Sequence, residues 1–349
     1  MFILRYFKKC KFSKSQRNYT DDYSYYQTCS IDMTLSGRFL LKRKKEVVDT
    51  CYFDQYPSHV LEEKLKIQIA KKYNLPKDDI ILGCGCNGIL QNLIKIFFNG
   101  NGNIVLPFYS FSQPEYAANS FGAYTKRVYC MEDYHINFQE MKHSVDKNTK
   151  AIFIANPNNP TGIYEDPLKI IKLAKNVNIP VIVSEAGIEF AQNKSLLEFN
   201  CPDNLIVIRS FSKAFGLSGL RIGFARLPYQ YKKLYLENIT KFEVSSLSMV
   251  FALKFINSAL ISKNVYNVIQ ERQYLENSLN KLKIPMIPSH SNILMSKNSY
   301  SDDFFLQLSK LGIGVVKIFD ELGKKHFRIA VQDKIVNRKF IRKMKGIKL

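Results

Sequence analysis

A lysine in a turn built from small residues is the first feature of this sequence that could do covalent chemistry. The stretch SFSKAFGLSGLRIGFA occupies residues 210–225, with Lys213 beside Ser212 and Arg221 eight positions further on. A surface lysine does not need such a setting, whereas an amine that bonds covalently to an anionic ligand does. The stretch therefore predicts a reactive amine at Lys213 with a fixed cation nearby.

Three other segments carry polar groups at the ends of predicted strands. ILGCGCNGILQNLI (81–94) predicts a strand, a glycine-rich turn where backbone N–H groups can approach an anion, and a helix. Such turns are also common plain connections. ANPNNPTG (155–162) follows a strand, and its prolines fix a turn that presents the Asn158 and Asn159 amides. VIVSEAGIEF (181–190) delivers further polar residues to the same edge.

The elements that must position these segments alternate along the chain. Apolar runs that predict buried strands lie at 103–107, 150–157, 180–186 and 204–212, and helical apolar faces lie within 89–98 and 168–174. Strands that alternate with helices predict an α/β fold with a mainly parallel, doubly wound sheet. Ligands bind beyond the carboxyl ends of such strands, where the polar segments lie.

The last third of the chain has a different pattern. We expect a large ligand-binding domain over residues 46–240 and a smaller α+β domain over 241–349. The small domain would contain a long helical stretch (247–282), a strand (291–295), a helix near 301–311 and two more strands. Residues 1–45 are expected to pack with the small domain or with a partner subunit.

In this order and spacing, the segments resemble the fold-type I enzymes that use pyridoxal 5′-phosphate (PLP). They are most similar to the histidinol-phosphate aminotransferase branch of the class I/II aminotransferases, with threonine-phosphate decarboxylase as a sibling. NNPTG together with SFSKAFGLSGLRIGFA carries the resemblance, which runs from about residue 31 to the C-terminus. It implies the PLP-dependent transferase fold, a large domain with a mainly parallel sheet and a smaller α+β domain.

The resemblance assigns a role to each polar group near the lysine. Lys213 would form the Schiff base with PLP and shuttle a proton at the substrate Cα. The phosphate would be held by the backbone amides of Cys86 and Asn87, the hydroxyls of Ser210 and Ser212, and the guanidinium of Arg221.

Four further residues follow from the resemblance. Asn159 would donate to the phenolic oxygen of PLP, and Tyr109 would stack on its ring. Arg328 in HFRIAV would hold the substrate α-carboxylate through two parallel hydrogen bonds. Tyr56 in DQYPSH would reach the phosphate in the neighbouring subunit, which implies a homodimer with active sites at the interface. The alternatives are a turn-forming Asn, a core aromatic and an edge-strand Arg.

The sequence departs from the family at two places near the cofactor. Ser184 stands where the family has the aspartate that pairs with the pyridine nitrogen, so Ser184 would hydrogen-bond this nitrogen without keeping it charged. Gly187 stands where the family has a tyrosine. Glu185 cannot replace the aspartate, because neighbouring strand residues point to opposite faces.

A third departure lies near the N-terminus. The segment IDMTLSGRFLL (31–41) replaces the family's Asn- and Pro-containing loop over the substrate. Arg38 in this segment would either bind a phosphate or carboxylate of the substrate or be a surface arginine.

Composition narrows the class of protein. The net charge of +21 indicates either a polyanionic partner or a lysine-rich bias, but no groove-reading motif accompanies it, so nucleic acid is not an expected partner. No apolar run approaches the ~20 residues that span a bilayer, and the first residues do not resemble a secretory signal. Seven cysteines at irregular spacing favour reduced thiols and a cytoplasmic location. We expect no metal site.

Three functions are compatible with these motifs. The first is transamination between glutamate and a small phosphorylated amine or carbonyl substrate. The second is decarboxylation of a phospho-amino acid, which uses the same lysine. The third is a catalytically weakened homologue, which the departures at Ser184 and Gly187 favour.

Overall fold

A seven-stranded sheet forms the centre of the large lobe. The structure is a computed structural model that describes residues 29–34, 54–98 and 100–347, so Arg38 lies outside the described residues. The strands follow the order β2 (Ile80–Gly83), β8 (Gly223–Arg226), β7 (Leu205–Ser210), β6 (Val181–Ser184), β5 (Thr149–Ala155), β3 (Asn103–Pro107) and β4 (Tyr124–Val128). Only β8 runs antiparallel to its neighbours, which confirms the predicted, mainly parallel sheet.

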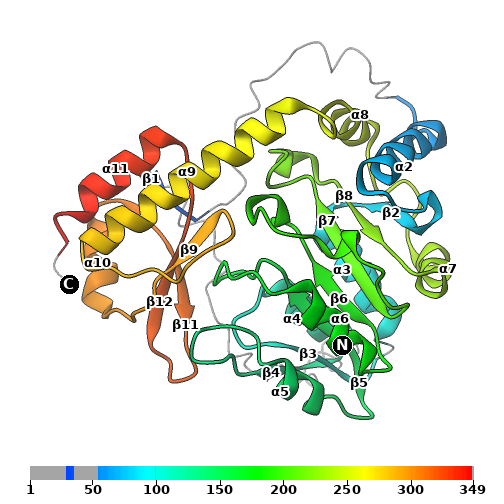
Figure 1. The fold of residues 1–349 in the computed structure, drawn as a ribbon, viewed down its shortest axis with the longest axis horizontal. Coiled ribbons are helices and arrows are strands. Elements are labelled where there is room, and N and C mark those ends of the chain that lie inside the picture. Colours follow the sequence, from blue (N-terminus) through cyan, green and yellow to red (C-terminus); the bar gives the residue numbers. More distant parts are fainter. Residues whose placement is uncertain (1–28, 35–53, 99, 348–349) are drawn as a thin grey trace, which may run out of the picture.

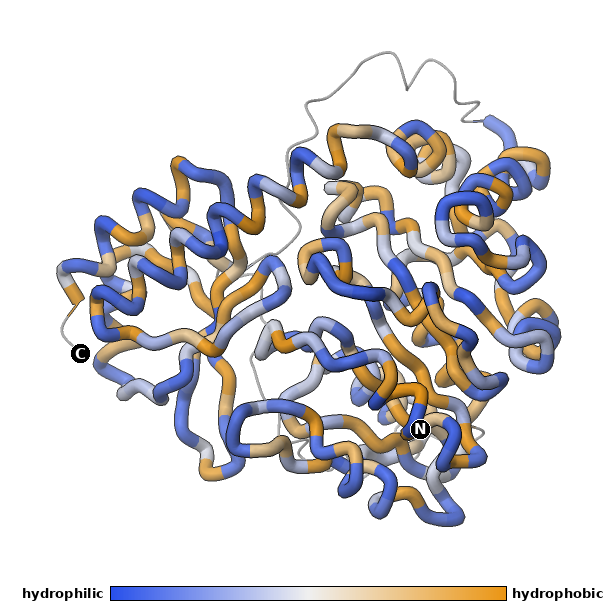
Figure 2. Tube along the Cα trace, in the orientation of Figure 1, coloured by the Kyte–Doolittle hydropathy of each residue, from blue (hydrophilic) through white to orange (hydrophobic). Residues whose placement is uncertain are grey.

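Helices cover both faces of this sheet (Figure 1). On one face pack α3 (Gly85–Phe97), α4 (Gln113–Ser120) and α7 (Tyr229–Asn238). On the other pack α2 (His59–Tyr73), α5 (Phe138–His143), α6 (Pro167–Lys175) and α8 (Ser246–Phe255). Figure 2 shows the central strands mostly hydrophobic, as expected for strands buried on both faces.

Alternation along β6 and β7 decides which polar residues face which layer. Ile206 and Ile208 pack with α3, whereas Val207 packs with the opposite layer. By the same period of two, Ser210 lies on the α3 face and Arg209 on the opposite face. At the end of β6, Ser184 likewise lies on the α3 face and Glu185 on the opposite face.

The small lobe contains a three-stranded antiparallel sheet in the order β11 (Val316–Phe319), β12 (Lys325–Ala330), β9 (Ile293–Met295). Around it lie α9 (Ala259–Lys281), α10 (Asp302–Lys310) and α11 (Lys334–Met344). The N-terminal strand β1 (Ile31–Asp32) pairs with β10 (Ile313–Gly314) of this lobe. Helix α9 runs from the large lobe to the small one (Figure 1). The predicted domain limits at residues 45 and 240 stay predictions.

The predicted helical stretch over 247–282 is wrong in one respect, because the structure has two helices there. Helix α8 ends at Phe255 and α9 begins at Ala259. Ser258 caps the second helix by accepting a hydrogen bond from the Leu260 N–H at 3.3 Å, a local interaction that starts a new helix. Four short 3-10 helices complete the described chain, at Lys77–Asp79, Ile188–Phe190, Leu196–Glu198 and Ser218–Leu220. No helix in the described ranges is both long and apolar enough to span a membrane.

Candidate active site

A cavity of about 280 Å³ lies where β6 and β7 end beside the N-terminus of α3, and we call it the Lys213 cavity. The structure brings these predicted residues into its lining: Cys86, Asn87, Asn159, Ser184, Ser210, Ser212, Lys213 and Arg221. They come from four segments that are far apart in the sequence. The position is the one that a parallel sheet offers to a ligand.

The N-terminus of α3 and Arg221 form one side of the cavity. The N-cap residue of α3, Cys84, makes no side-chain cap hydrogen bond. Gly85 begins the helix with φ +70°, and a Cβ at this position would lie 3.0 Å from Arg221 Nη2. Glycine therefore lets the guanidinium sit directly on the first turn of the helix, where N–H groups favour an anion.

The Arg221 side chain is held in this place by its own turn. Its Nη1 donates to the Ser218 carbonyl at 2.7 Å, and its backbone has φ +50°. Gly223 also allows a close approach of the backbone, because a Cβ there would lie 2.7 Å from the Arg209 carbonyl oxygen and 3.1 Å from the Cys86 nitrogen. We call Gly85 and Gly223 the glycine cradle. The small residues predicted around Lys213 thus allow β8, β7 and α3 to approach closely.

The Lys213 amine is easier to deprotonate than an ordinary lysine. Burial lowers its pKa to about 8, and the positive charges of Arg328 and Arg221 act in the same direction. At neutral pH roughly a tenth of the amine is therefore uncharged. An uncharged amine is the nucleophilic form.

The thiol of Cys86 stays protonated in this setting. Burial raises its pKa to about 11, against the opposing effect of hydrogen bonds with Ser210 and Ser184. Because only the thiolate is a strong nucleophile, the contribution of Cys86 is its backbone amide at the start of α3.

The carboxylate nearest to this site in sequence points away from it. Glu185 accepts hydrogen bonds from Ser195 Oγ at 2.5 Å and from the Leu196 N–H at 2.7 Å, and it pairs with Arg209 at 3.4 Å, behind the sheet. Among the described residues that line the Lys213 cavity there is no Asp or Glu. The cavity therefore presents two cations, hydroxyls and amides without a compensating carboxylate.

Arg328 of β12 does not itself line this cavity, but it contacts Asn159, which does. Its Nη1 donates to Asn159 Oδ1 at 3.1 Å, and its Nη2 donates to the Thr34 carbonyl at 2.5 Å. Because the Asn159 oxygen faces Arg328, the NH₂ group of the same amide points to the other side. The turn itself is fixed by Asn158, whose Nδ2 donates to the Tyr109 carbonyl at 2.8 Å.

The structure does not bring Tyr109 to the Lys213 cavity. Tyr109 is buried beside Phe108 and Tyr134 and lines a different cavity, and the burial raises the pKa of its hydroxyl. Phe111, two residues further on, lines the Lys213 cavity instead. Strand β3 ends at Pro107, so strand alternation no longer predicts side-chain directions over 108–111.

Tyr56 lies on the surface and outside this cavity. It is 81% exposed, and its ring stacks on the exposed Phe242 with 4.9 Å between the ring centroids. Two exposed aromatic rings in contact form an apolar patch.

Sequence reasoning missed four aromatic or polar residues in the cavity lining: Phe111, Ser218, Ser291 and Asn292. Ser218 belongs to the lysine stretch and could have been found from its position. Ser291 and Asn292 lie beside the predicted strand at 291–295, but no pattern in the sequence shows which loop of the small lobe meets the large lobe.

Comparison with known proteins gives a consistent family. The family model for aminotransferase class I and II matches residues 38–343. The histidinol-phosphate aminotransferase of Caldanaerobacter subterraneus subsp. tengcongensis is 31% identical over 278 residues, which cover 78% of each chain. That of Thermoanaerobacter pseudethanolicus is 32% identical with the same coverage.

Solved structures agree at the level of the fold. Histidinol-phosphate aminotransferase from Sinorhizobium meliloti, in complex with PLP, superposes with a TM-score of 0.81 at 17% identity, over 93% of this chain and 94% of that one. The enzyme from Clostridium acetobutylicum gives 0.76 at 24% identity, over 86% of this chain and 92% of that one. These matches confirm the predicted resemblance, and the chain belongs to the aminotransferase class I and II family, whose members are PLP-dependent transaminases.

Proposed function

We propose that this protein uses PLP to transfer an amino group between glutamate, or a similar donor, and a small phosphorylated amine or its carbonyl counterpart. The relatives described above are histidinol-phosphate aminotransferases, which supports a phosphorylated substrate. The observation that carries the proposal is the Lys213 amine, with its lowered pKa, in a cavity whose described lining includes Arg221 and no carboxylate.

The residues of the cavity fit PLP. A phosphate needs several donors and positive charge in one place, and the first turn of α3, Ser210, Ser212 and Arg221 supply them. The glycine cradle at Gly85 and Gly223 leaves no room for side chains that would cover these donors. Asn159 offers its amide NH₂ group from the opposite wall.

The chemistry divides between the cofactor and the chain. When bound, PLP supplies an aldehyde carbon for covalent linkage to Lys213 and a ring that withdraws electrons from the substrate Cα. Once the substrate amine has displaced it from PLP, the free Lys213 amine would hold or move the proton at Cα, which requires a pKa close to the working pH. The lowered pKa of about 8 meets this requirement.

Arg328 is suited to hold the substrate carboxylate. Its guanidinium is buried, and Asn159 and the Thr34 carbonyl fix its plane. A fixed planar guanidinium binds a carboxylate in one orientation. The N-terminal segment that carries Thr34 therefore helps to orient the amino donor.

Ser184 is expected to slow the removal of the Cα proton. It lines the cavity at the end of β6, where the family has an aspartate. A hydroxyl can hydrogen-bond the pyridine nitrogen but adds no negative charge to keep that nitrogen protonated. The ring then withdraws electrons less strongly.

A homodimer belongs to this proposal. The exposed Tyr56 and Phe242 form an apolar surface feature of the large lobe. Burial of such aromatics is typical of interfaces between subunits. Tyr56 would approach the Lys213 cavity of the partner subunit from this surface.

Transamination is favoured over the other two predicted functions. The family match and the relatives are aminotransferases, which supports transamination over decarboxylation. The amine and the proposed phosphate donors line one cavity, and Arg328 contacts the lining residue Asn159, which argues against a homologue without catalysis.

The test is the covalent attachment of PLP to Lys213. Wild-type protein with PLP should show a visible absorption band, and borohydride should fix a pyridoxyl group on Lys213. Lys213→Ala should lose the band, the tag and about 10³-fold or more of the rate of amino transfer from glutamate.

Lys72→Ala is the matched control. Lys72 Nζ donates to the Ile256 carbonyl at 2.7 Å in a partly buried hydrogen bond, but Lys72 lies outside the Lys213 cavity. This variant should keep the band and the tag. A wild-type protein that stays colourless in excess PLP would refute the proposal.

A further inference from the structure

Two polar residues of the small lobe lie against the Lys213 cavity beside Gly187. Ser291 and Asn292 are 6% and 3% exposed and precede β9. A Cβ at Gly187 would lie 3.6 Å from Ser291 Oγ and 4.0 Å from Asn292 Oδ1. Because residue 187 is a glycine, the Ser291 hydroxyl faces the cavity without a side chain in front of it.

The backbone that carries this hydroxyl is tightly held. Arg272 Nη1 donates to the Ser291 carbonyl at 2.8 Å, and the Ser291 N–H donates to Ser289 Oγ at 3.0 Å. The Val331 N–H donates to the Asn292 carbonyl at 2.9 Å. The position of the Ser291 side chain is therefore fixed from three sides.

The hydroxyl itself is only weakly engaged. Ser291 Oγ donates to Asn292 Oδ1 at 3.3 Å, which is longer than the usual range of about 2.5–3.0 Å for such bonds. If this O–H turned toward a better acceptor, only the long hydrogen bond with Asn292 would be lost. A buried hydroxyl with a fixed backbone and a weak internal bond is a prepared donor for a ligand oxygen.

The same loop is docked on the turn that carries Asn159. The His290 N–H donates to the Gly162 carbonyl at 2.7 Å. Gly162 has φ +78°, and a Cβ at this position would overlap Ser289 Oγ. Only glycine allows this contact, so Ser291 and Asn159 are held in one unit across the two lobes.

We propose that Ser291 donates a hydrogen bond to a ligand oxygen in the Lys213 cavity, and that the contact of its loop with Gly162 positions this donor. The inference rests on the proposed function, since the oxygen belongs to PLP or to the amino acid bound beside it. The chemistry is the same in both cases, an oxygen acceptor opposite Gly187. Ser291 thereby supplies a polar contact next to the position where the family has a tyrosine.

Ser291→Ala tests the donor, with Ser291→Thr as the variant that restores a hydroxyl. Loss of one neutral hydrogen bond should change binding about three- to tenfold. If the acceptor is the phenolic oxygen of PLP, Ser291→Ala shifts the pH midpoint of the visible band and raises the Kd for PLP without substrate present. If the acceptor belongs to the substrate, the spectrum and Kd stay unchanged and KM for glutamate rises with a smaller change in kcat.

Ser296→Ala is the control for a serine change in the same lobe. Ser296 is buried, and its Oγ donates to the Asn298 carbonyl at 3.0 Å, away from the cavity lining. This variant should match the wild type in band, Kd and KM. The inference is overturned if Ser291→Ala also matches the wild type, or if Ser291→Thr is as impaired as Ser291→Ala.

Gly162→Ala tests the positioning contact. The added methyl must push Ser289 and with it the loop of Ser291, so the readout changed by Ser291→Ala should change here in the same direction. Wild-type values in this variant would overturn the positioning role. A wild-type protein that does not bind PLP would instead refute the proposed function, and the two failures are thus distinguishable.

Discussion

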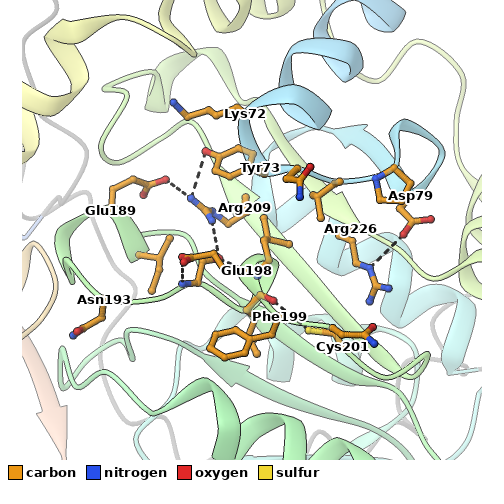
Figure 3. A pocket seen from close by; sticks show the side chains of 18 of the residues that line it. Lys72, Tyr73, Asp79, Glu189, Asn193, Glu198, Phe199, Cys201, Arg209 and Arg226 are labelled. Atoms are coloured by element: carbon orange, nitrogen blue, oxygen red, sulfur yellow. Dashed lines mark hydrogen bonds and ion pairs between the residues drawn. The ribbon is translucent and has the colours of Figure 1, made fainter.

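Two cavities lie on opposite faces of the central sheet, each lined by one residue of β7, and they differ in how their charged residues are paired. The Lys213 cavity of about 280 Å³ lies on the α3 side of β6 and β7. A larger cavity of about 820 Å³ lies on the other side, and we call it the Arg209 cavity (Figure 3). Volume alone would select the larger one as the site, yet the residues of the proposed chemistry line the smaller.

The charges of the Arg209 cavity pair with one another. Arg209 is 3% exposed, and it donates to Glu189 at 2.7 Å, to Ser195 at 3.1 Å and to Glu185 at 3.4 Å. Its guanidinium also lies 4.8 Å from the centre of the Tyr73 ring. The cations of this cavity already have acceptors inside the protein, which leaves little attraction for an external anion.

The Lys213 cavity has the opposite balance. Lys213 and Arg221 line it together with hydroxyls and amides, and no described lining residue is a carboxylate. Electrostatic attraction for an anionic ligand comes from charge that the protein has not compensated. The comparison teaches that the sign and pairing of buried charges identify the binding site better than the size of a hollow.

An ion pair connects the strand ends that lie next to the two cavities. Ser184 is followed by Glu185, and Arg209 is followed by Ser210, so each pair places one residue on each face. The ion pair behind the sheet therefore joins the two strand ends whose serines line the site. A change behind the sheet should affect stability first.

Removal of the Arg209 charge should have the largest effect, on the free energy of unfolding. Arg209→Met leaves Glu185 buried and Glu189 partly buried without their cationic partner, which should lower the free energy of unfolding by about 3–5 kcal/mol. Burial raises the pKa of Glu185, so the folded state takes up this proton at higher pH than the unfolded state. The loss should therefore shrink as the pH falls toward 4.5, the ordinary pKa of a glutamate, in urea unfolding of the PLP-free protein.

Arg226→Met is the control in the same cavity. Arg226 pairs with Asp79 at 3.5 Å, and the two side chains are 15% and 26% exposed. Loss of this more exposed pair should cost only up to about 1 kcal/mol. Equal costs for both variants would contradict the distinction between a buried network and a peripheral pair.

The Lys213 side chain should, in contrast, destabilise the PLP-free protein. The folded-state pKa of about 8 lies below the value of 10.5 for an ordinary lysine, so the unfolded chain binds more protons between these two pH values. Stability then rises with pH across this window. At pH 7, Lys213→Met should be more stable than the wild type by up to about 3 kcal/mol.

The pH dependence separates this charge effect from a simple gain in packing. The advantage of Lys213→Met should decline as the pH is raised from 8 to 10.5 in urea titrations. Lys233→Met, at an exposed position of α7, should change stability little at any pH. A constant advantage of Lys213→Met across the range would contradict a buried amine with a lowered pKa at this position.

The two cavities also show what the sequence could and could not predict. Lys213, Ser210 and Arg221 were predictable because they lie within one short stretch with fixed spacing. The direction of Glu185 followed from strand alternation. Ser291 was not predictable, because its place in the site depends on how the two lobes pack together. Ser291 and Asn159 are more than a hundred residues apart in the sequence and belong to different lobes.

Sequence periodicity predicted the structure correctly only within regular strands and helices. The strands at 103–107 and 204–212 were predicted from apolar runs and correspond to β3 and β7. Beyond the end of β3 the period of two no longer applies, and Phe111 lines the cavity instead of Tyr109. The break at Ser258 was missed because one capping hydrogen bond outweighs a continuing apolar pattern.

A carboxylate added on the α3 face of β6 should have a smaller effect, on the rate of proton removal from the substrate. Ser184→Asp places a negative charge where the family's aspartate pairs with the pyridine nitrogen, while Glu185 stays with Arg209 behind the sheet. We expect the half-reaction with glutamate to become about tenfold faster, which corresponds to about 1.4 kcal/mol. Stopped-flow rates with glutamate deuterated at Cα would show whether proton removal is the step that changes.

Ser212→Asp is the matched control, since it adds the same charge to the same cavity near the groups proposed to hold the phosphate. There the carboxylate should repel the ligand and raise the Kd for PLP, with no gain in rate. If both variants weakened PLP binding equally and neither became faster, the cavity would respond only to total charge. A gain at Ser184 alone would show that position matters as well, because one carboxylate stabilises a proton on the ring whereas the other competes with the phosphate for Arg221.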